Sequence, residues 1–287
     1  MFHRLRQKLF QKPVTAHSTH PSEQVSASLL APTQSAPSDD NIEPSLSDAC
    51  MSGWFRQDTG ELLEGFPILS TDTVLDVGCG NGSFVKFCAQ FGPAVIFSDI
   101  DAAKVAAVGA LLAETSARSL RPLVSDSNPL PLENATASKI LCMEVLEHVD
   151  DPHQVMRELV RVGQPGALYL LTVPDSASET VLKKVAPSIF FEKPNHVRVF
   201  GREEFEQLIV SAGLVVERRS YHGFYWSIWW MMFCACEQDL SPPWHPVLQH
   251  WTRTWETLLT MEKGAEIKKA LDEFMPKSQA IIARKPL

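Results

Sequence analysis

The 287-residue chain lacks several features that would assign it to particular protein classes. It has no apolar stretch of the roughly 20 residues that a membrane-spanning helix requires. It also lacks an excess of basic residues, because 34 acidic side chains outnumber 26 Lys and Arg and give a formal net charge of −8. Proteins that bind nucleic acid rely on basic patches, so we expect no nucleic-acid partner.

The chain also lacks a cysteine pattern typical of a metal site or a disulfide framework. Its six cysteines are scattered, and two of them fall in segments that we expect to be buried. Cys234 and Cys236 are the one close pair, and their apolar surroundings favour packing over redox or metal chemistry. We therefore expect reduced thiols and an intracellular, cytoplasmic protein.

Residues 1–50 contain few large apolar side chains after a short basic start. Residues 13–48 are rich in Pro, Ser, Thr, Gln and Ala, and they cannot bury enough surface to offset the entropy of ordering. We expect residues 1–50 to be a disordered tail and residues 51–287 to fold. The basic, amphipathic residues 1–12 leave three interpretations open: a frayed terminus, a helix that touches anionic membrane, or a targeting segment.

The central motif is the run V-L-D-V-G-C-G-N-G-S-F at residues 74–84. It predicts a buried strand, a glycine turn and a helix that begins near Ser83. Glycines at alternate positions let the backbone turn sharply and approach a ligand closely, because no Cβ intrudes. A nucleotide-like ligand lying over this turn would meet the N-terminus of the helix that follows.

The glycine spacing distinguishes two classes of nucleotide ligand. The dinucleotide fingerprint is G-x-G-x-x-G, whereas here the third glycine comes one position early. An acid two residues before the first glycine suits a ligand with an ammonium and a sulfonium group. The run resembles motif I of the class I S-adenosylmethionine (SAM) dependent methyltransferases, D/E-x-G-x-G-x-G. This resemblance implies that SAM binds at Asp76, Gly78, Cys79, Gly80, Asn81 and Gly82.

Two further predicted strands also end in acids. Residues 94–99 end at Asp99, and ligands of open parallel sheets lie beyond the carboxyl ends of strands. The two carboxylate oxygens of Asp99 can accept hydrogen bonds from vicinal ribose hydroxyls. Residues 122–126 end at Asp126, which we expect to accept from an adenine amino group while the Ser127 N–H faces a ring nitrogen. Ile100 completes the cofactor-binding set at these two strand ends.

The predicted fourth strand, residues 139–143, is followed by E-V-L-E-H-V-D-D-P at residues 144–152. This run resembles the hallmark of one methyltransferase branch, which includes ubiquinone-pathway and related small-molecule enzymes. Glu144 joins the predicted cofactor-binding residues. His148, beside Glu147, is the first candidate for a general base because its ordinary pKa suits work at neutral pH. His196 is the second candidate.

A divalent metal is an alternative role for the same side chains. In some methyltransferases with E-x-x-E-H, such as ubiquinone O-methyltransferases and small-RNA 3′-end methyltransferases, these residues hold a metal beside the acceptor hydroxyl. The resemblance then implies Glu144, Glu147 and His148 as ligands, with His196 as a fourth. Metal coordination would lower the pKa of the acceptor. Other relatives with the same letters need no metal, so metal dependence stays open.

The resemblance implies an α/β fold, a Rossmann-like sheet of seven strands whose last strand is antiparallel. Residues 166–174, 214–218 and 278–284 are the predicted fifth, sixth and seventh strands, and residues 54–66 are expected to form one or two helical turns. Residues 222–276 separate the last two strands as a helical insertion that holds six of the seven tryptophans. This insertion either forms a small core of its own or caps an apolar acceptor pocket.

We predict a SAM-dependent methyltransferase that acts on an oxygen, less readily a carbon or nitrogen, of a small, apolar or lipid-like acceptor. One alternative is a binding or partner subunit of the same fold without turnover. Another is an NAD-linked oxidoreductase, which the glycine spacing and the lack of an evident Tyr-x-x-x-Lys pair disfavour. Peripheral membrane contact through residues 1–12 or the aromatic insertion remains a further expectation.

Overall fold

A computed structural model describes residues 46–287 of the chain. The predicted features of residues 1–45 lie outside the described residues. The described helices and strands are α2 (Leu46–Met51), β1 (Trp54–Arg56), β2 (Glu61–Leu63), β3 (Thr73–Val77), α3 (Ser83–Ala89), β4 (Ala94–Asp99), α4 (Ala102–Leu112), β5 (Ser119–Val124), β6 (Ala137–Met143), α5 (Pro152–Val162), β7 (Gly163–Pro174), α6 (Ser176–Leu182), the 3₁₀ turn η1 (Ser188–Phe191), α7 (Arg202–Ser211), β8 (Val215–His222), α8 (Phe224–Ala235), α9 (Pro246–Leu259), α10 (Gly264–Phe274) and β9 (Ser278–Arg284).

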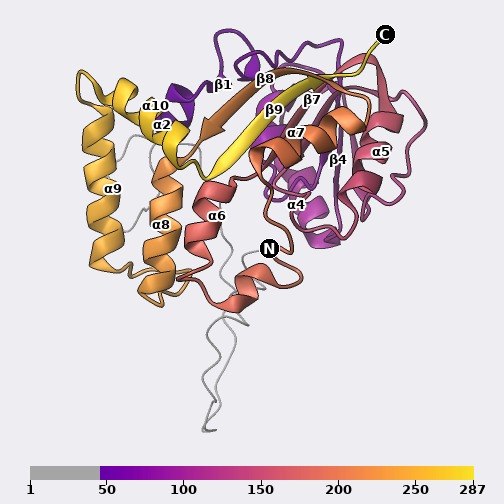
Figure 1. The fold of residues 1–287 in the computed structure, drawn as a ribbon. Coiled ribbons are helices and arrows are strands. Elements are labelled where there is room, and N and C mark those ends of the chain that lie inside the picture. Colours follow the sequence, from indigo (N-terminus) through magenta and orange to yellow (C-terminus); the bar gives the residue numbers. More distant parts are fainter. Residues whose placement is uncertain (1–45) are drawn as a thin grey trace, which may run out of the picture.

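The main sheet has seven strands in the order β5-β4-β3-β6-β7-β9-β8 (Figure 1). Strands β3 to β7 pair in parallel, and β9 pairs antiparallel with both β7 and β8. The predicted fold class, including the antiparallel last strand and the helical insertion before it, is confirmed. From β3 the chain continues to β4 and β5 on one side, and it then returns to β6 and β7 on the other side of β3. The boundary between β3 and β6 is therefore a topological switch point, where ligands of open α/β sheets bind.

Successive side chains along the central strands point to opposite faces of the sheet, so the core is divided between these two faces. Tyr169 and Leu171 point to the face covered by α5 and α7, whereas Leu168 and Leu170 point to the opposite face. Helices α3 and α4 pack on that opposite face around Phe97. Because both faces are covered, β3 and β6 read as nearly continuous apolar runs rather than as alternating ones.

The segment that precedes the main sheet differs from the prediction. Residues 54–66 were expected to form helical turns, but β1 and β2 form a two-stranded antiparallel sheet instead. The turn between them uses Gly60 at φ +71°, a conformation that disfavours a continuing helix and that glycine adopts without strain. Helix α2 also begins at Leu46, before the predicted boundary at residue 51, because contacts with the insertion order it.

The insertion forms a layer of helices beside the sheet. Helices α8, α9 and α10 lie next to one another, and α6 lies beside α8 (Figure 1). Aromatic rings fill this layer, with Trp229 stacked on Phe233 and Tyr225 stacked on Trp251. The same apolar cluster includes Leu182 of α6 and the rings of η1, so the insertion packs against the segment that follows β7.

A buried ionic network ties α2 to the insertion. Lys268 of α10 is only 2% exposed, and its ammonium contacts Asp272, Ser52 and Asp48. Asp48 also accepts a 2.7 Å hydrogen bond from the indole N–H of Trp255, and burial raises the pKa of Asp48. Buried charges are tolerated when they are paired, so these contacts hold α2 against α9 and α10.

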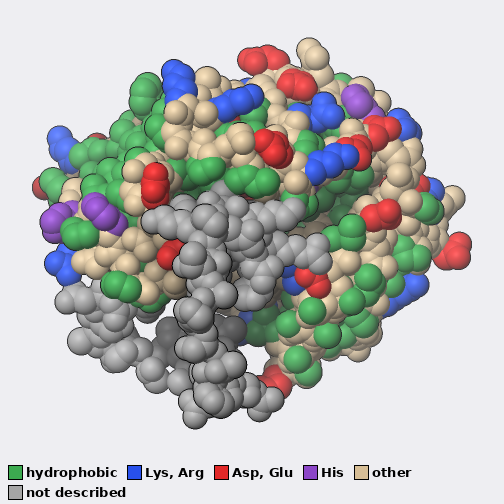
Figure 2. Space-filling view, turned by 90° about the horizontal axis from the view of Figure 1, so that it is seen from below, with side chains coloured by type: hydrophobic (Ala, Val, Ile, Leu, Met, Phe, Trp, Pro, Cys, Tyr) green, Lys and Arg blue, Asp and Glu red, His purple; other side chains and the backbone are tan. Residues whose placement is uncertain are grey.

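The surface of the described chain mixes charges of both signs. Figure 2 shows one face, on whose described part acidic, basic and hydrophobic side chains are interspersed without a broad basic patch. Among residues 46–287, we find no helix with both the length and the apolar character needed to cross a bilayer.

We expect Lys268→Met to lower the free energy of unfolding by about 3–5 kcal/mol, because it leaves Asp48 and Asp272 buried without their cation. Urea unfolding monitored by tryptophan fluorescence measures this loss. Lys269→Met is the matched control, since the neighbouring Lys269 is exposed and should change stability by less than about 0.5 kcal/mol. Equal effects of the two variants would show that the network does not stabilise the fold.

Candidate active site

The turn after β3 is built from glycines in the left-handed region. Gly78, Gly80 and Gly82 have φ values of +75°, +56° and +81°. A Cβ on Gly78 would lie 2.4 Å from a methyl carbon of Val145, and one on Gly82 would lie 3.0 Å from Val108. Both the backbone conformation and the space therefore require glycine at these two positions.

Asp76 and Asp99 lie at the carboxyl ends of the adjacent strands β3 and β4. They are 4% and 7% exposed, and each faces the charge of the other. Burial, together with the charge of Asp99, raises the pKa of Asp76 to about 7. Asp99 accepts hydrogen bonds from the N–H groups of Gly80, at 3.2 Å, and Asp101, at 2.9 Å. These bonds orient Asp99 against the glycine turn.

Other predicted cofactor-binding residues surround this pair of acids. Cys79 is buried, and burial and the nearby acids raise the pKa of its thiol to about 12, so it stays protonated at neutral pH. Asn81 accepts a 3.1 Å hydrogen bond from the Ser83 N–H at the start of α3. Ile100 is 73% exposed directly after Asp99, as an apolar group that a bound ligand could cover.

The loop after β5 carries the two residues that were predicted to contact adenine. Asp126 lies in this loop, at the edge of the sheet that β3 and β4 share. Its carboxylate accepts a 3.0 Å hydrogen bond from the Asn128 N–H. The Ser127 N–H, which was predicted to face a ring nitrogen, donates to the hydroxyl of Ser125 at 3.0 Å. This loop holds its own shape through side chain to backbone bonds.

The segment after β6 brings a second group of residues against the glycine turn. Its Val145 contacts Gly78 directly. The carboxylate of Glu144 forms a 2.8 Å ion pair with Lys277, the residue before β9. Burial by itself would raise the pKa of Glu144, but the ammonium of Lys277 outweighs burial and lowers it. Glu144 was predicted to bind the cofactor, and in this structure its partner is a lysine of the chain.

Glu147 and His148 follow within the same segment. Glu147 is fully buried, and within residues 46–287 neither of its carboxylate oxygens has a hydrogen-bond partner. Burial and the charge of Glu144 raise the pKa of Glu147 well above its usual range. His148 has a ring nitrogen 3.5 Å from Glu147, and burial lowers its pKa to about 4. His148 is therefore a neutral imidazole at neutral pH.

His196 reaches the same place from the loop between η1 and α7. Its ring lies 5.0 Å from the ring of His148. Its Nδ1 lies 2.8 Å from a carboxylate oxygen of Glu179 on α6. The structure thus brings together all three residues that were predicted to act on the acceptor.

Two residues of the site were missed by the sequence analysis. Glu179 lies on α6 without a motif around it, and Lys277 precedes β9 at the end of the insertion. The ammonium of Lys277 interacts with both Glu144 and Glu179, and these acids raise its pKa although burial opposes its charge. No pattern in the sequence indicated either residue, because burial and contacts between distant segments are not visible in it.

The site contains side chains that fit a divalent metal ion. Possible ligand atoms of Glu147, His148 and His196 all lie within 4.8 Å of one another. The unpaired, buried oxygens of Glu147 are the observation that tests this fit, because such atoms in native proteins need a partner, an ion or water. Two imidazoles and one carboxylate form a donor set that divalent metals accept. These residues would hold the ion, with Glu144 occupied by Lys277.

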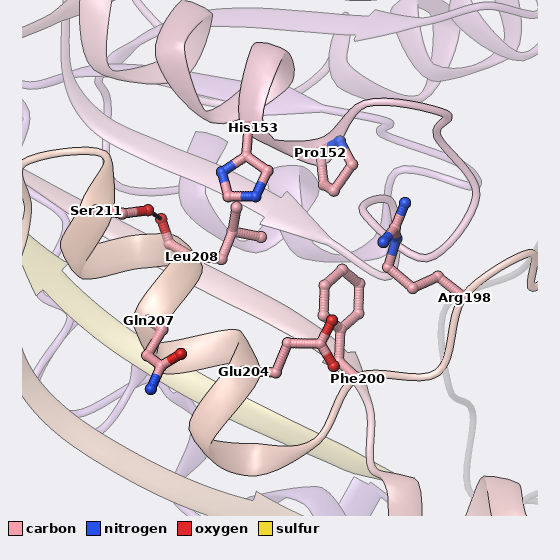
Figure 3. Close-up of a pocket in the computed structure, with 8 residues that line it drawn as sticks. All are labelled: Pro152, His153, Arg198, Phe200, Glu204, Gln207, Leu208 and Ser211. Atoms are coloured by element: carbon pink, nitrogen blue, oxygen red, sulfur yellow. Dashed lines mark hydrogen bonds between the residues drawn. The ribbon is translucent and has the colours of Figure 1, made fainter.

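A cavity of about 260 Å³ lies away from these residues (Figure 3). Its charged side chains serve local structure, since Glu204 accepts from the Gly201 N–H and Arg198 donates to the Asp150 carbonyl. We therefore assign it no part of the site. Residues from α5, α7 and the loop before α7 line it: Pro152, His153, Arg198, Phe200, Glu204, Gln207, Leu208 and Ser211.

Known proteins are similar to this chain in sequence. Residues 49–218 match the family described as methyltransferase domain. A probable SAM-dependent methyltransferase of Mycolicibacterium smegmatis is 29% identical over 144 residues, which are 50% of this chain and 52% of that protein. A ubiquinone biosynthesis O-methyltransferase of Paracidovorax citrulli is 30% identical over 166 residues, 55% of this chain and 66% of that protein. The chain thus spans about half to two thirds of the length of these relatives.

A solved structure agrees with the fold. A complex between the Haloferax volcanii Trm112 methyltransferase activator and a methyltransferase contains a chain that is 17% identical, with a TM-score of 0.55. The match covers 85% of this chain and 90% of that one, and at this identity it establishes the fold alone. The family match, in contrast, extends over more than half of the sequence. The chain therefore belongs to the methyltransferase-domain family and has the fold of its class I, SAM-dependent members.

Proposed function

We propose that the protein transfers a methyl group from SAM to an oxygen of a small, apolar acceptor. The observation that carries this proposal is the contact between Gly78 and Val145. It joins the glycine turn and its two acids to the cluster of Glu147, His148 and His196. A methyl donor above the turn would therefore lie beside groups that can act on an acceptor proton.

Asp76 and Asp99 fit the two polar ends of the donor. The ionised carboxylate of Asp76 suits the ammonium or sulfonium charge, and Asp99 suits the ribose hydroxyls. SAM already carries an electrophilic methyl group, so the protein's main tasks are alignment of the reactants and exclusion of water. The buried position of both acids supports this role, because interactions between charges are stronger where water is excluded.

The acceptor group is proposed to be a hydroxyl because the site is equipped for proton removal. The pKa of His148, at about 4, makes it a weak base at neutral pH, so we assign this task to His196, whose Nδ1 lies 2.8 Å from a carboxylate oxygen of Glu179. A divalent ion held by Glu147, His148 and His196 would supply the same chemistry by lowering the pKa of the acceptor hydroxyl. The relative from Paracidovorax citrulli is an O-methyltransferase by name, which agrees with an oxygen acceptor.

The apolar character of the acceptor is inferred from the surroundings of His196. Its ring lies 6.5 Å from that of Phe191, and the neighbouring Phe190 contacts Trp230 of α8 at 6.2 Å. The aromatic cluster of the insertion therefore extends to the edge of the histidine pair. Apolar walls with a few convergent polar groups are typical of small-molecule sites.

We expect isothermal titration calorimetry to show binding of SAM, and binding of NAD to be weaker. Asp99→Ala should weaken SAM binding by roughly 1.5–3 kcal/mol, because it removes charged acceptors for the ribose hydroxyls. Asp101→Ala is the control, since Asp101 caps α4 through the Ala103 N–H and is not proposed to touch the ligand. Tighter binding of NAD than of SAM would reverse the assignment.

We expect SAM affinity to rise with pH between about 5.5 and about 7, because the ligand's positive charge favours the ionised form of Asp76. Folding raises the pKa of this acid from its ordinary 3.8 to about 7, so the free protein retains the proton over this range. For the same reason, Asp76 lowers the free energy of unfolding as pH rises from about 4 to about 7. Asp76→Asn should flatten the pH dependence of binding, and an unchanged profile in this variant would exclude Asp76 as its source.

We expect mass spectrometry to detect methyl ethers when SAM is supplied with phenols that carry long alkyl tails. His196→Ala should lower kcat by about 10²–10⁴ and leave SAM affinity unchanged, because it removes a group that acts on the acceptor proton. Activity that a chelator abolishes and Mn²⁺ restores would identify the metal route. A methylated nitrogen or carbon would contradict the oxygen acceptor, and SAM binding without turnover on a broad acceptor panel would favour a non-catalytic subunit.

A further inference from the structure

Glu179 makes the closest polar contact with a histidine of the site. Its Oε2 lies 2.8 Å from Nδ1 of His196, and the two side chains are 1% and 18% exposed. The second oxygen of Glu179 has no hydrogen-bond partner within residues 46–287. A buried carboxylate with one short contact to an imidazole nitrogen holds that nitrogen in one place.

The segment that carries Glu179 is itself held by buried contacts. Asp175, which is fully buried, caps α6 by accepting from the Ala177 N–H at 2.8 Å. The same carboxylate accepts from the guanidinium of Arg202 at 2.8 Å. Glu179 follows on the first turn of α6, and its backbone N–H donates to the Asp175 carbonyl at 3.1 Å. The contacts of Asp175, directly after β7, therefore hold the first turn of α6 and with it Glu179.

The loop that carries His196 is also held from both sides. Asn195 is buried and donates its side-chain amide to the Ile189 carbonyl at 2.7 Å. The backbone N–H of His196 donates to the Phe190 carbonyl, and that of Val197 donates to the Glu147 carbonyl. The last bond connects this loop to the segment that contains the other two acceptor-site residues. His196 thus has little freedom to turn away from Glu179.

The contact between Glu179 and His196 lies beside a cation of the chain. The ammonium of Lys277 interacts with Glu179 as well as with Glu144, with which it forms an ion pair. An ionised carboxylate can only accept a hydrogen bond, so it selects the form of the imidazole in which Nδ1 carries the proton. The other ring nitrogen, Nε2, then has a free lone pair.

We propose that Glu179 is a positioning residue that keeps the proton of His196 on Nδ1 and leaves Nε2 free to act on the acceptor. This inference rests on the proposed function, whereas the contact between Glu179 and His196 does not depend on the identity of the acceptor. It serves both routes considered for the site, since Nε2 is the atom that would take a proton or bind a metal. Partners of the distal nitrogen commonly set the orientation and basicity of an imidazole.

Nitrogen-15 NMR of the full chain labelled at histidine tests the proposal without a known acceptor. At about pH 8, above the ordinary pKa of histidine, the signals of His196 should show the Nδ1-protonated form in large excess. Signals are assigned by comparison with His196→Gln. Glu179→Leu should shift the ratio toward the Nε2-protonated form, whereas Glu179→Gln should preserve it because the amide oxygen still accepts.

Glu192→Leu is the matched control, because Glu192 is an exposed acid in the same loop as His196. A wild-type spectrum dominated by the Nε2-protonated form would overturn the proposal, even if Glu179→Leu failed to fold. A spectrum of folded Glu179→Leu that matched the wild type would do the same. SAM calorimetry separates the two hypotheses, since absent SAM binding with the expected spectra would refute the proposed function and leave the role of Glu179 in place.

Discussion

The close approach of Gly78 to Val145 is the constraint on which the candidate site depends. The turn after β3 and the segment after β6 meet there because the two strands are neighbours in the sheet and both end at the same edge. A side chain at position 78 would separate these two segments. The absence of a Cβ therefore does more than permit a positive φ, because it sets the distance between the proposed donor site and the acceptor residues.

Buried carboxylates are the second requirement of this site, and each is stabilised differently. Asp99 accepts backbone N–H groups, Glu144 is paired with Lys277, and Asp76 holds a proton up to about pH 7. Both oxygens of Glu147 lack a hydrogen-bond partner within the described residues, and burial raises the pKa of Glu147 well above its usual range. Groups that are costly to bury and incompletely paired are found at functional sites more often than elsewhere, because ligand binding can satisfy them. The unsatisfied oxygens thus mark where a ligand, proton or ion belongs.

The insertion packs against two other parts of the fold, α2 and η1. Its helices are anchored to α2 by the buried network around Lys268 and to η1 by aromatic contacts near His196. A segment that was recognisable only as helical and rich in tryptophan therefore borders the residues proposed to act on the acceptor. Its role could not be read from periodicity, because a helix that lines a pocket and a helix that fills a core have the same apolar stripe.

The sequence by itself determined the elements whose signals are local. Alternate glycines after a strand, acids at the ends of strands, and the run from Glu144 to Pro152 predict the residues along the edge of the sheet, and the resemblance that they carry implies its antiparallel last strand. The prediction was wrong for residues 54–66, which form a local hairpin with Gly60 in its turn, and it missed the start of α2, which contacts with the insertion hold in place. Only the tertiary structure placed Glu179 beside His196 and Lys277 beside Glu144. Such pairs join segments that are distant in sequence, and their partners are chosen by the packing of helices and strands rather than by any pattern within one segment.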